Sequence, residues 1–164
     1  MIARHTERGA VLIIALVFLL VLTLLGITAT STSTMQERMA GNLRDNNLAF
    51  QSAESALRDG EGLLQQATLP VFNDTDGLLQ MQTGSAEASF WNTYDWGGNS
   101  RAAPAVAGTS AVPRYVVEEL PPVPVEGDSL RFGALPDVGF YRVTARAVGG
   151  SNDAVSILQI TYRR

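Results

Sequence analysis

Few residues in this chain of 164 could carry out chemistry themselves. There is no cysteine and no lysine, and the single histidine, His5, lies within the first eight residues. Nucleophilic catalysis needs a serine, threonine or cysteine beside a base that is usually histidine, and zinc sites of the usual kind need cysteine or histidine. We therefore expect that the protein is not an enzyme and that it has no catalytic residue, no cofactor and no metal site.

The carboxylates offer two candidate sites, and their spacing argues against both. The run NDTDG at 73–77 resembles a calcium loop, but an EF-hand aligned on its glycine would place Phe72 first and Thr83 last, where oxygen ligands are required. A turn is the better prediction for this run. Glu118 and Glu119 are neighbours in a predicted strand, so their side chains should point to opposite faces and cannot act as a pair.

A more informative pattern concerns a bond that could be cut. The basic residues Arg4 and Arg8 lead to Gly9, and residues 10–27 are then apolar except for Thr23. As a helix, this stretch would rise about 27 Å, close to the roughly 30 Å thickness of a bilayer's hydrocarbon core. The positive-inside rule predicts that the N-terminus stays in the cytoplasm while the rest is exported.

Three interpretations of this N-terminus compete. A signal peptide cut after the apolar stretch is disfavoured, because the stretch exceeds the usual length and residues 27–29 form a poor cleavage motif. The alternatives are an uncleaved anchor and a cut after Gly9, which would leave the apolar helix on the mature protein.

The segment after the apolar stretch continues the helical pattern. No proline occurs between residue 10 and Pro70, so one helix is predicted from about residue 10 to about residue 69. Residues 10–29 would be its membrane half and residues 30–69 an amphipathic continuation, with residues 26–34 a weak point because they are poor helix formers. The predicted packing seam, spaced by alternating steps of three and four, consists of Met39, Leu43, Phe50, Ala53, Leu57 and Leu64.

Three parts of the sequence resemble a known family. These are the basic leader, ERMAGNLRDNNLAFQSAESALRDGE at 37–61 and YRVTARAVGGSNDAVSILQITYRR at 141–164. In these parts the chain resembles type IV pilins, and in particular PilX-type minor pilins. The resemblance implies that residues 1–9 are a leader, removed by a prepilin peptidase after Gly9, and that the new amine of Ala10 is methylated. It also implies other minor pilins and the major pilin as partners, and no nucleic acid.

The mature N-terminus departs from the major-pilin pattern at two positions. Major pilins usually begin with an aromatic residue and carry a glutamate five residues in, whereas this chain has Ala10 and Ile14. The resemblance extends to glutamate-lacking minor pilins and to the minor pseudopilins of type II secretion. It implies a minor pilin that resides first in the inner membrane. Because Ile14 cannot neutralise the amine of a subunit above it, we expect the protein to prime pilus assembly and to lie at or near the filament tip. The alternative is that Ile14 simply makes a better membrane helix. A type II secretion pseudopilin and a tip subunit that is adhesive, or carries a large adhesin, remain alternatives, and twitching motility and cell adhesion are the processes expected.

Residues 70–164 are predicted to form a globular pilin-like domain. Strands are expected near 114–120, 140–148 and 154–163, which gives an α+β fold with a long helix packed on a small antiparallel sheet. The glutamates of the first strand and two arginines of the second, Arg142 and Arg146, are expected to form exposed cross-strand pairs. Four aromatic residues within 90–96 should cover a small core or form a contact surface. The net charge of −4 argues against a nucleic-acid binder.

Overall fold

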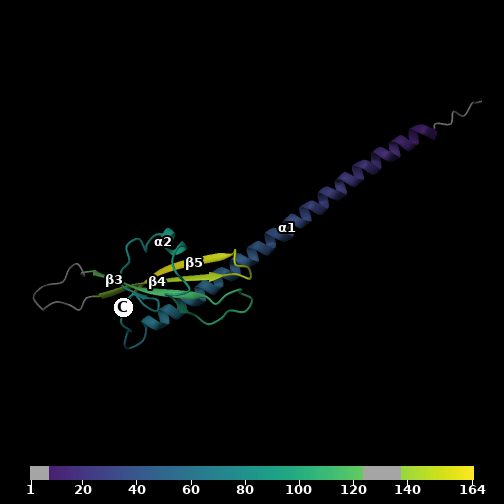
Figure 1. Ribbon diagram of the computed structural model, residues 1–164. Helices are drawn as coiled ribbons and strands as arrows, with labels where there is room; N and C mark the ends of the chain where they lie inside the picture. Colours follow the sequence, from purple (N-terminus) through teal and green to yellow (C-terminus); the bar gives the residue numbers. More distant parts are fainter. Residues whose placement is uncertain (1–7, 124–137) are drawn as a thin grey trace, which may run out of the picture. The chain divides into compact units, whose positions relative to one another are not determined.

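The computed structural model describes residues 8–123 and 138–164 (Figure 1). The chain divides into two compact units, with the boundary between Asn42 and Leu43. Helix α1, Arg8–Leu64, contributes to both units. Each unit is described separately below.

The first unit is the N-terminal stretch of α1, and it is helical throughout its described length. The weak helix formers of residues 26–34 do not interrupt it. Threonine hydroxyls in and just before this stretch donate to the backbone carbonyl oxygen four residues earlier, which satisfies the hydroxyl within the helix. These donors, with distances of 2.6–3.1 Å, are Thr23, Thr28, Thr30, Thr32 and Thr34.

The second unit combines the rest of α1 with a mixed five-stranded sheet. The strands are β1 Leu78–Leu79, β2 Arg101–Ala102, β3 Arg114–Val123, β4 Val138–Val148 and β5 Val155–Arg163, and a short helix, α2, spans Ala88–Asn92. The order β1-β3-β4-β5, with β2 also paired to β3, confirms the predicted α+β arrangement. The three predicted strands, β3, β4 and β5, pair antiparallel as expected, and the sheet is mixed because β1 pairs with β3 in parallel. Strands β1 and β2 are two residues long, too short for an alternating pattern to reveal them.

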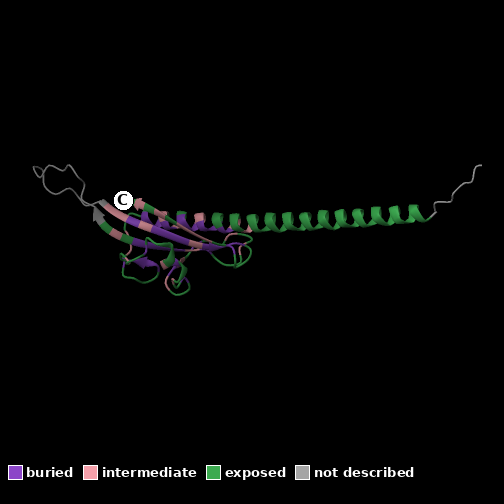
Figure 2. Cartoon of the chain, turned by 90° about the horizontal axis from the view of Figure 1, so that it is seen from above, coloured by how far each residue is buried: buried purple, intermediate pink, exposed green. Residues whose placement is uncertain are grey.

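Both faces of the sheet are covered, since successive side chains of a strand point to opposite sides. On one face Val117, Val143 and Ala145 pack against the buried residues of α1. On the other face Val116 packs with Leu79 and the two tryptophans. Figure 2 shows the buried residues concentrated in the strands and in the C-terminal part of α1.

The buried face of α1 differs from the predicted seam. Ala53, Leu57 and Leu64 lie in the core, with exposed fractions of 0, 7 and 0%. Phe50 is 48% exposed and Leu43 is 65% exposed, so assigning these two positions to the packed face was wrong. Met39, in the first unit, is 52% exposed there.

Small residues explain this difference. The helix faces the sheet through Ala49, Ser52, Ala56 and Gly60, which alternate with the few larger buried residues. A Cβ added at Gly60 would meet the side chain of Val143, so the two backbones approach closely at this point. Burial of the small residues turns Phe50 toward the edge of the packed face.

The helix ends five residues before the predicted position. The N–H of Gln66 donates to the Leu63 carbonyl, a tight last turn, and Arg164 donates to the Ala67 carbonyl. Pro70 disfavours the helical conformation at the residue before it. The chain therefore leaves the helix at Leu64 and turns toward β1.

Candidate functional site

Gly9, Ala10 and Ile14 lie together in the first turns of α1, and all three are exposed. A Cβ added at Gly9 would meet no atom within 4 Å. Alanine would also favour a helix by about 1 kcal/mol over glycine. Neither packing nor helix formation therefore explains a glycine at this position.

The surroundings of Ile14 contain no charge. No residue from Ala10 to Gln36 is acidic or basic, and the Ile14 side chain is 54% exposed among other apolar residues. This helix is long and apolar enough to cross a membrane. A positive amine at Ala10 would thus have no carboxylate within this stretch of its own chain to neutralise it.

A shallow hollow marks one face of the same helix. It is lined by Ile27 and by five small or hydroxylated residues, which are Thr23, Gly26, Thr30, Ser31 and Thr34. Because small side chains let a neighbouring helix approach closely, this is the face of the first unit best shaped for helix packing.

In the second unit a buried carboxylate ties the aromatic loop to the sheet. The Glu118 side chain, 1% exposed, accepts hydrogen bonds from the Gln82 N–H at 2.7 Å and the Ser85 hydroxyl at 2.6 Å. The Arg142 guanidinium lies 3.2 Å from the other carboxylate oxygen. The expected cross-strand partner of Glu118 is confirmed, but its exposure was predicted wrongly, because the loop that covers it was not recognised in the sequence.

The aromatic residues 90–96 form part of a core. Trp91 and Trp96 are buried, and the Trp91 indole N–H donates to the Ser85 carbonyl at 2.7 Å. Tyr94 donates to the Asn99 carbonyl, and burial, together with the nearby Asp95 and Asp74, raises the pKa of its phenol to about 12. Of the two roles considered for this cluster, covering the sheet is the one that these contacts describe.

A second polar contact joins α1 to the turn between β4 and β5. The Asp45 carboxylate accepts hydrogen bonds from the Ser151 hydroxyl, the Ser151 N–H and the Gly150 N–H. The Ser151 hydroxyl bond is the main cause that lowers the pKa of Asp45, and desolvation opposes it. A Cβ at Gly149 would overlap with Asp45, so glycine is required there. The sequence indicated the hairpin turn but not its partner on the helix.

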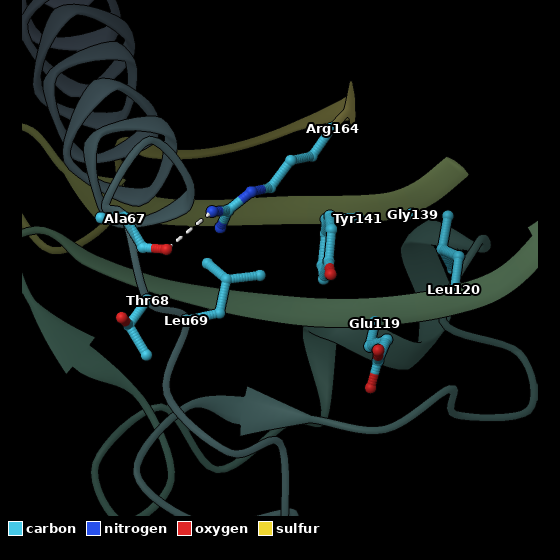
Figure 3. A pocket seen from close by; sticks show the side chains of 8 residues that line it. All are labelled: Ala67, Thr68, Leu69, Glu119, Leu120, Gly139, Tyr141 and Arg164. Atoms are coloured by element: carbon cyan, nitrogen blue, oxygen red, sulfur yellow. Dashed lines mark hydrogen bonds between the residues drawn. The ribbon is translucent and has the colours of Figure 1, made fainter. Parts of the chain in front are cut away.

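A groove of about 620 Å³ lies where the chain leaves α1 and approaches the ends of β3 and β4 (Figure 3). Its polar groups are Thr68, Glu119, Tyr141 and Arg164, and the last of these reaches the Ala67 carbonyl at 3.3 Å. Burial raises the pKa of Tyr141, with Glu119 adding to the rise and Arg164 opposing it. Within the described residues no group of three or more His, Cys, Asp or Glu could hold a metal ion.

Comparison with protein-family models identifies the N-terminal part of the chain. Residues 8–58 match the model described as PilX N-terminal. This part of the chain is similar to PilX N-terminal domains. Comparison with curated proteins and with solved structures gives no match.

The PilX N-terminal domain contains most of the residues singled out from the sequence. Gly9, Ala10 and Ile14 lie within it, as do all the seam residues except Leu64. The match supports a role as a PilX-type minor pilin of a type IV pilus, a structural component of the filament. The apolar start of α1 fits a membrane anchor for such a subunit.

Proposed function

We propose that this protein is the minor pilin that starts assembly of a type IV pilus and lies at or near the filament tip, in a complex with other minor pilins. The observation that carries the proposal is Ile14 within a PilX N-terminal domain. In pilins that have a glutamate at this position, the carboxylate of an incoming subunit is thought to neutralise the N-terminal amine of the subunit above.

The absence of a glutamate at position 14 indicates which place in the filament suits this subunit. An unpaired charge at a membrane centre costs about 2.5–3.5 kcal/mol on insertion scales. Ile14 cannot neutralise an amine above it, and it loses nothing where no subunit lies above. The amine of Ala10 can still be met by a glutamate from the next subunit below. These properties suit the topmost place in the filament.

Removal of a leader is part of the same proposal. A prepilin peptidase would cut between Gly9 and Ala10, since the exposed Gly9 has no packing role that would explain it. The mass of the mature protein from membranes should correspond to a chain that begins at Ala10, with one added methyl group. Replacing Gly9 by leucine should leave the precursor uncut, whereas Gly26→Leu, at another unpacked glycine, should be processed normally. A mature N-terminus at Met1 or near Thr30 would contradict this part.

Tip location is tested by labelling and imaging. The chain has no cysteine, so an introduced cysteine on the exposed surface of the second unit gives a single labelling position. We expect label at one end of sheared pili and fewer pili in cells that lack the protein. Label along the shaft at high copy number would rule the tip location out.

A matched pair of substitutions tests the role of position 14 itself. Ile14→Glu supplies the absent carboxylate and should allow the subunit to enter the shaft, so that label spreads along the filament. Ile13→Glu adds the same charge at the adjacent position, about 100° around the helix, and should not have this effect. An identical label distribution for the two variants would show that the carboxylate position does not determine the subunit's place.

A further inference from the structure

Strand β5 lies at the margin of the sheet and pairs with β4 alone among the described residues. The register runs without a shift from Val148↔Val155 to Phe140↔Arg163. In an antiparallel ladder the N–H and C=O groups of alternate residues point to opposite sides of the strand. One side of β5 therefore presents backbone donors and acceptors with no strand beside them.

Two hydrogen bonds show which residues face outward. Gly149 N–H donates to the Ala154 carbonyl at 2.8 Å, and Arg164 N–H donates to the Gly139 carbonyl at 2.9 Å. The even-numbered residues of this strand thus bond to β4. The residues whose backbone groups point outward are Val155, Ile157, Gln159, Thr161 and Arg163.

Within the described residues 8–123 and 138–164, this edge lacks the usual protection against pairing with another chain. Natural edge strands are blunted by proline, lysine, inward charges, bulges or a covering element. β5 contains no proline, has no charged residue before Arg163 and is rich in β-branched and aromatic residues. A long and regular edge of this kind is suited to strand addition.

Apolar side chains beside the edge are incompletely covered. Leu158, Ile160 and Tyr162 are half-buried against the helix-side core, and Ile157 is half-buried against the aromatic side. Val155 is 42% exposed. An added strand would cover apolar surface on both faces of the sheet as well as satisfying the backbone groups.

The direction of β5 argues against a second copy of this chain as the partner that pairs with its outer edge. Asp45 contacts Ser151 just before β5 begins, and Ala67 contacts Arg164 just after it ends. β5 therefore runs in the same direction as residues 45–64 of α1. Antiparallel pairing of two copies would point these helices in opposite directions, which disagrees with subunits entering a filament from one membrane. Parallel pairing in register would place two Arg163 side chains next to each other, and like charges destabilise such a pair.

We propose that the outer edge of β5 docks an extended segment of a different pilus subunit, which adds to the sheet as a further strand. The segment would carry apolar or β-branched residues at alternate positions and a carboxylate beside Arg163, since that exposed guanidinium has no ion-pair partner among the described residues. This proposal rests on the proposed function and names the surface through which the subunit joins its complex.

Amide hydrogen exchange resolved by residue tests the pairing on the full chain, alone in detergent and assembled with the other pilins of its own cells. The amides of 156, 158, 160 and 162 should be protected in both states. The amides of 155, 157, 159, 161 and 163 should exchange fast in the isolated chain. In the assembly their exchange rates should fall by up to about tenfold, as one net backbone hydrogen bond for each amide implies. Outward amides that stay fast in the assembly would overturn the proposal.

Substitutions at one outward position give a matched control. Thr161→Pro removes an outward N–H without removing a bond to β4, and proline is tolerated where an edge N–H faces solvent. Thr161→Ala keeps the N–H. We expect recovery of the other minor pilins with this protein to fall about tenfold for the proline variant and to be unchanged for alanine. Equal recovery would contradict strand addition. If the proline variant does not fold, the exchange experiment decides.

Three outcomes of these experiments are distinguishable. If the wild-type chain assembles with no other pilin, the proposed function fails, and the edge proposal fails with it. If it assembles while the outward amides remain fast, only the edge proposal fails. Protection of the outward amides in the isolated chain, rising with its concentration, would assign the edge to a second copy and would overturn the partner proposed here.

Discussion

Two glycines that lie two positions apart on α1 allow a test of how closely the helix approaches the sheet. Gly60 is buried, and a Cβ there would meet the Val143 side chain and would lie 3.2 Å from Tyr115 Cδ2. Gly62 is exposed, and a Cβ there would meet nothing within 4 Å. The two positions share a helix and a residue type but differ in the space available.

The expected effects follow from two opposing contributions to the free energy of unfolding. Replacing a helix-interior glycine by alanine stabilises by about 0.8–1.0 kcal/mol, and this gain is common to both positions. Overpacking a close-packed core costs about 1–3 kcal/mol. Val143, fully buried, has no free space to move into. We therefore expect Gly62→Ala to stabilise by about 1 kcal/mol and Gly60→Ala to be about 1–3 kcal/mol less stable than Gly62→Ala.

Denaturant unfolding followed by tryptophan fluorescence would measure this difference. Both tryptophans of the chain, Trp91 and Trp96, are buried in the second unit, so the signal reports that unit. The full chain in detergent is the appropriate sample, with both variants and the wild type measured side by side. Equal stabilisation by the two substitutions would refute the close approach of helix and sheet at Gly60.

Three further comparisons test other contacts of the second unit. Leu57→Ala should destabilise by about 2–5 kcal/mol because the side chain is buried, whereas Phe50→Ala, at a half-exposed position, should cost clearly less; both are measured by denaturation. Glu118→Ala should cost about 3–5 kcal/mol because it leaves the Arg142 guanidinium unpaired, while Glu119→Ala, at the exposed neighbouring position, should change stability by less than about 0.5 kcal/mol. Folding lowers the pKa of Asp45, so the contribution of its carboxylate to stability is complete above the ordinary pKa of 3.8 and is lost as pH falls through the pKa of the folded state. The unfolding free energies of wild type and Asp45→Asn should therefore differ at neutral pH and converge in acid.

The sequence predicted the elements that have a strong period. The apolar stretch from Ala10 has no charge, and β3, β4 and β5 alternate over nine to eleven residues, so the helix and the three long strands could be located. One expected cross-strand pair is also present, since Glu118 lies opposite Arg142, but Glu119 lies opposite Tyr141 and Arg146 lies opposite Arg114, so the other expected pairing was wrong. The two-residue strands β1 and β2 could not be found because they are too short to show a pattern.

The buried face of α1 was harder to predict, for a physical reason. Hydrophobic periodicity weights large side chains, and Leu43 and Phe50 therefore drew the predicted seam toward themselves. The real contact is governed by how closely the backbone of the helix can approach the sheet, which favours Ala53, Ala56 and Gly60. The burial of Glu118 was missed for a related reason, because a loop without regular structure covers it. The roles of Gly9, Ala10 and Ile14 remain predictions, since they concern a peptidase and neighbouring subunits.

The threonines of the first unit affect how this helix could exchange one environment for another. The hydroxyls of Thr23, Thr28, Thr30, Thr32 and Thr34 each donate to a backbone carbonyl of the same helix, so none of these five donors needs a partner outside the helix. Lipid chains offer no hydrogen bonds, and the buried interior of a filament offers few. A helix whose threonine hydroxyls are satisfied internally can pass from lipid to a protein environment without breaking or making hydrogen bonds at those hydroxyls. Under the proposed function, the transfer of this helix from the bilayer to the filament would then depend mainly on packing.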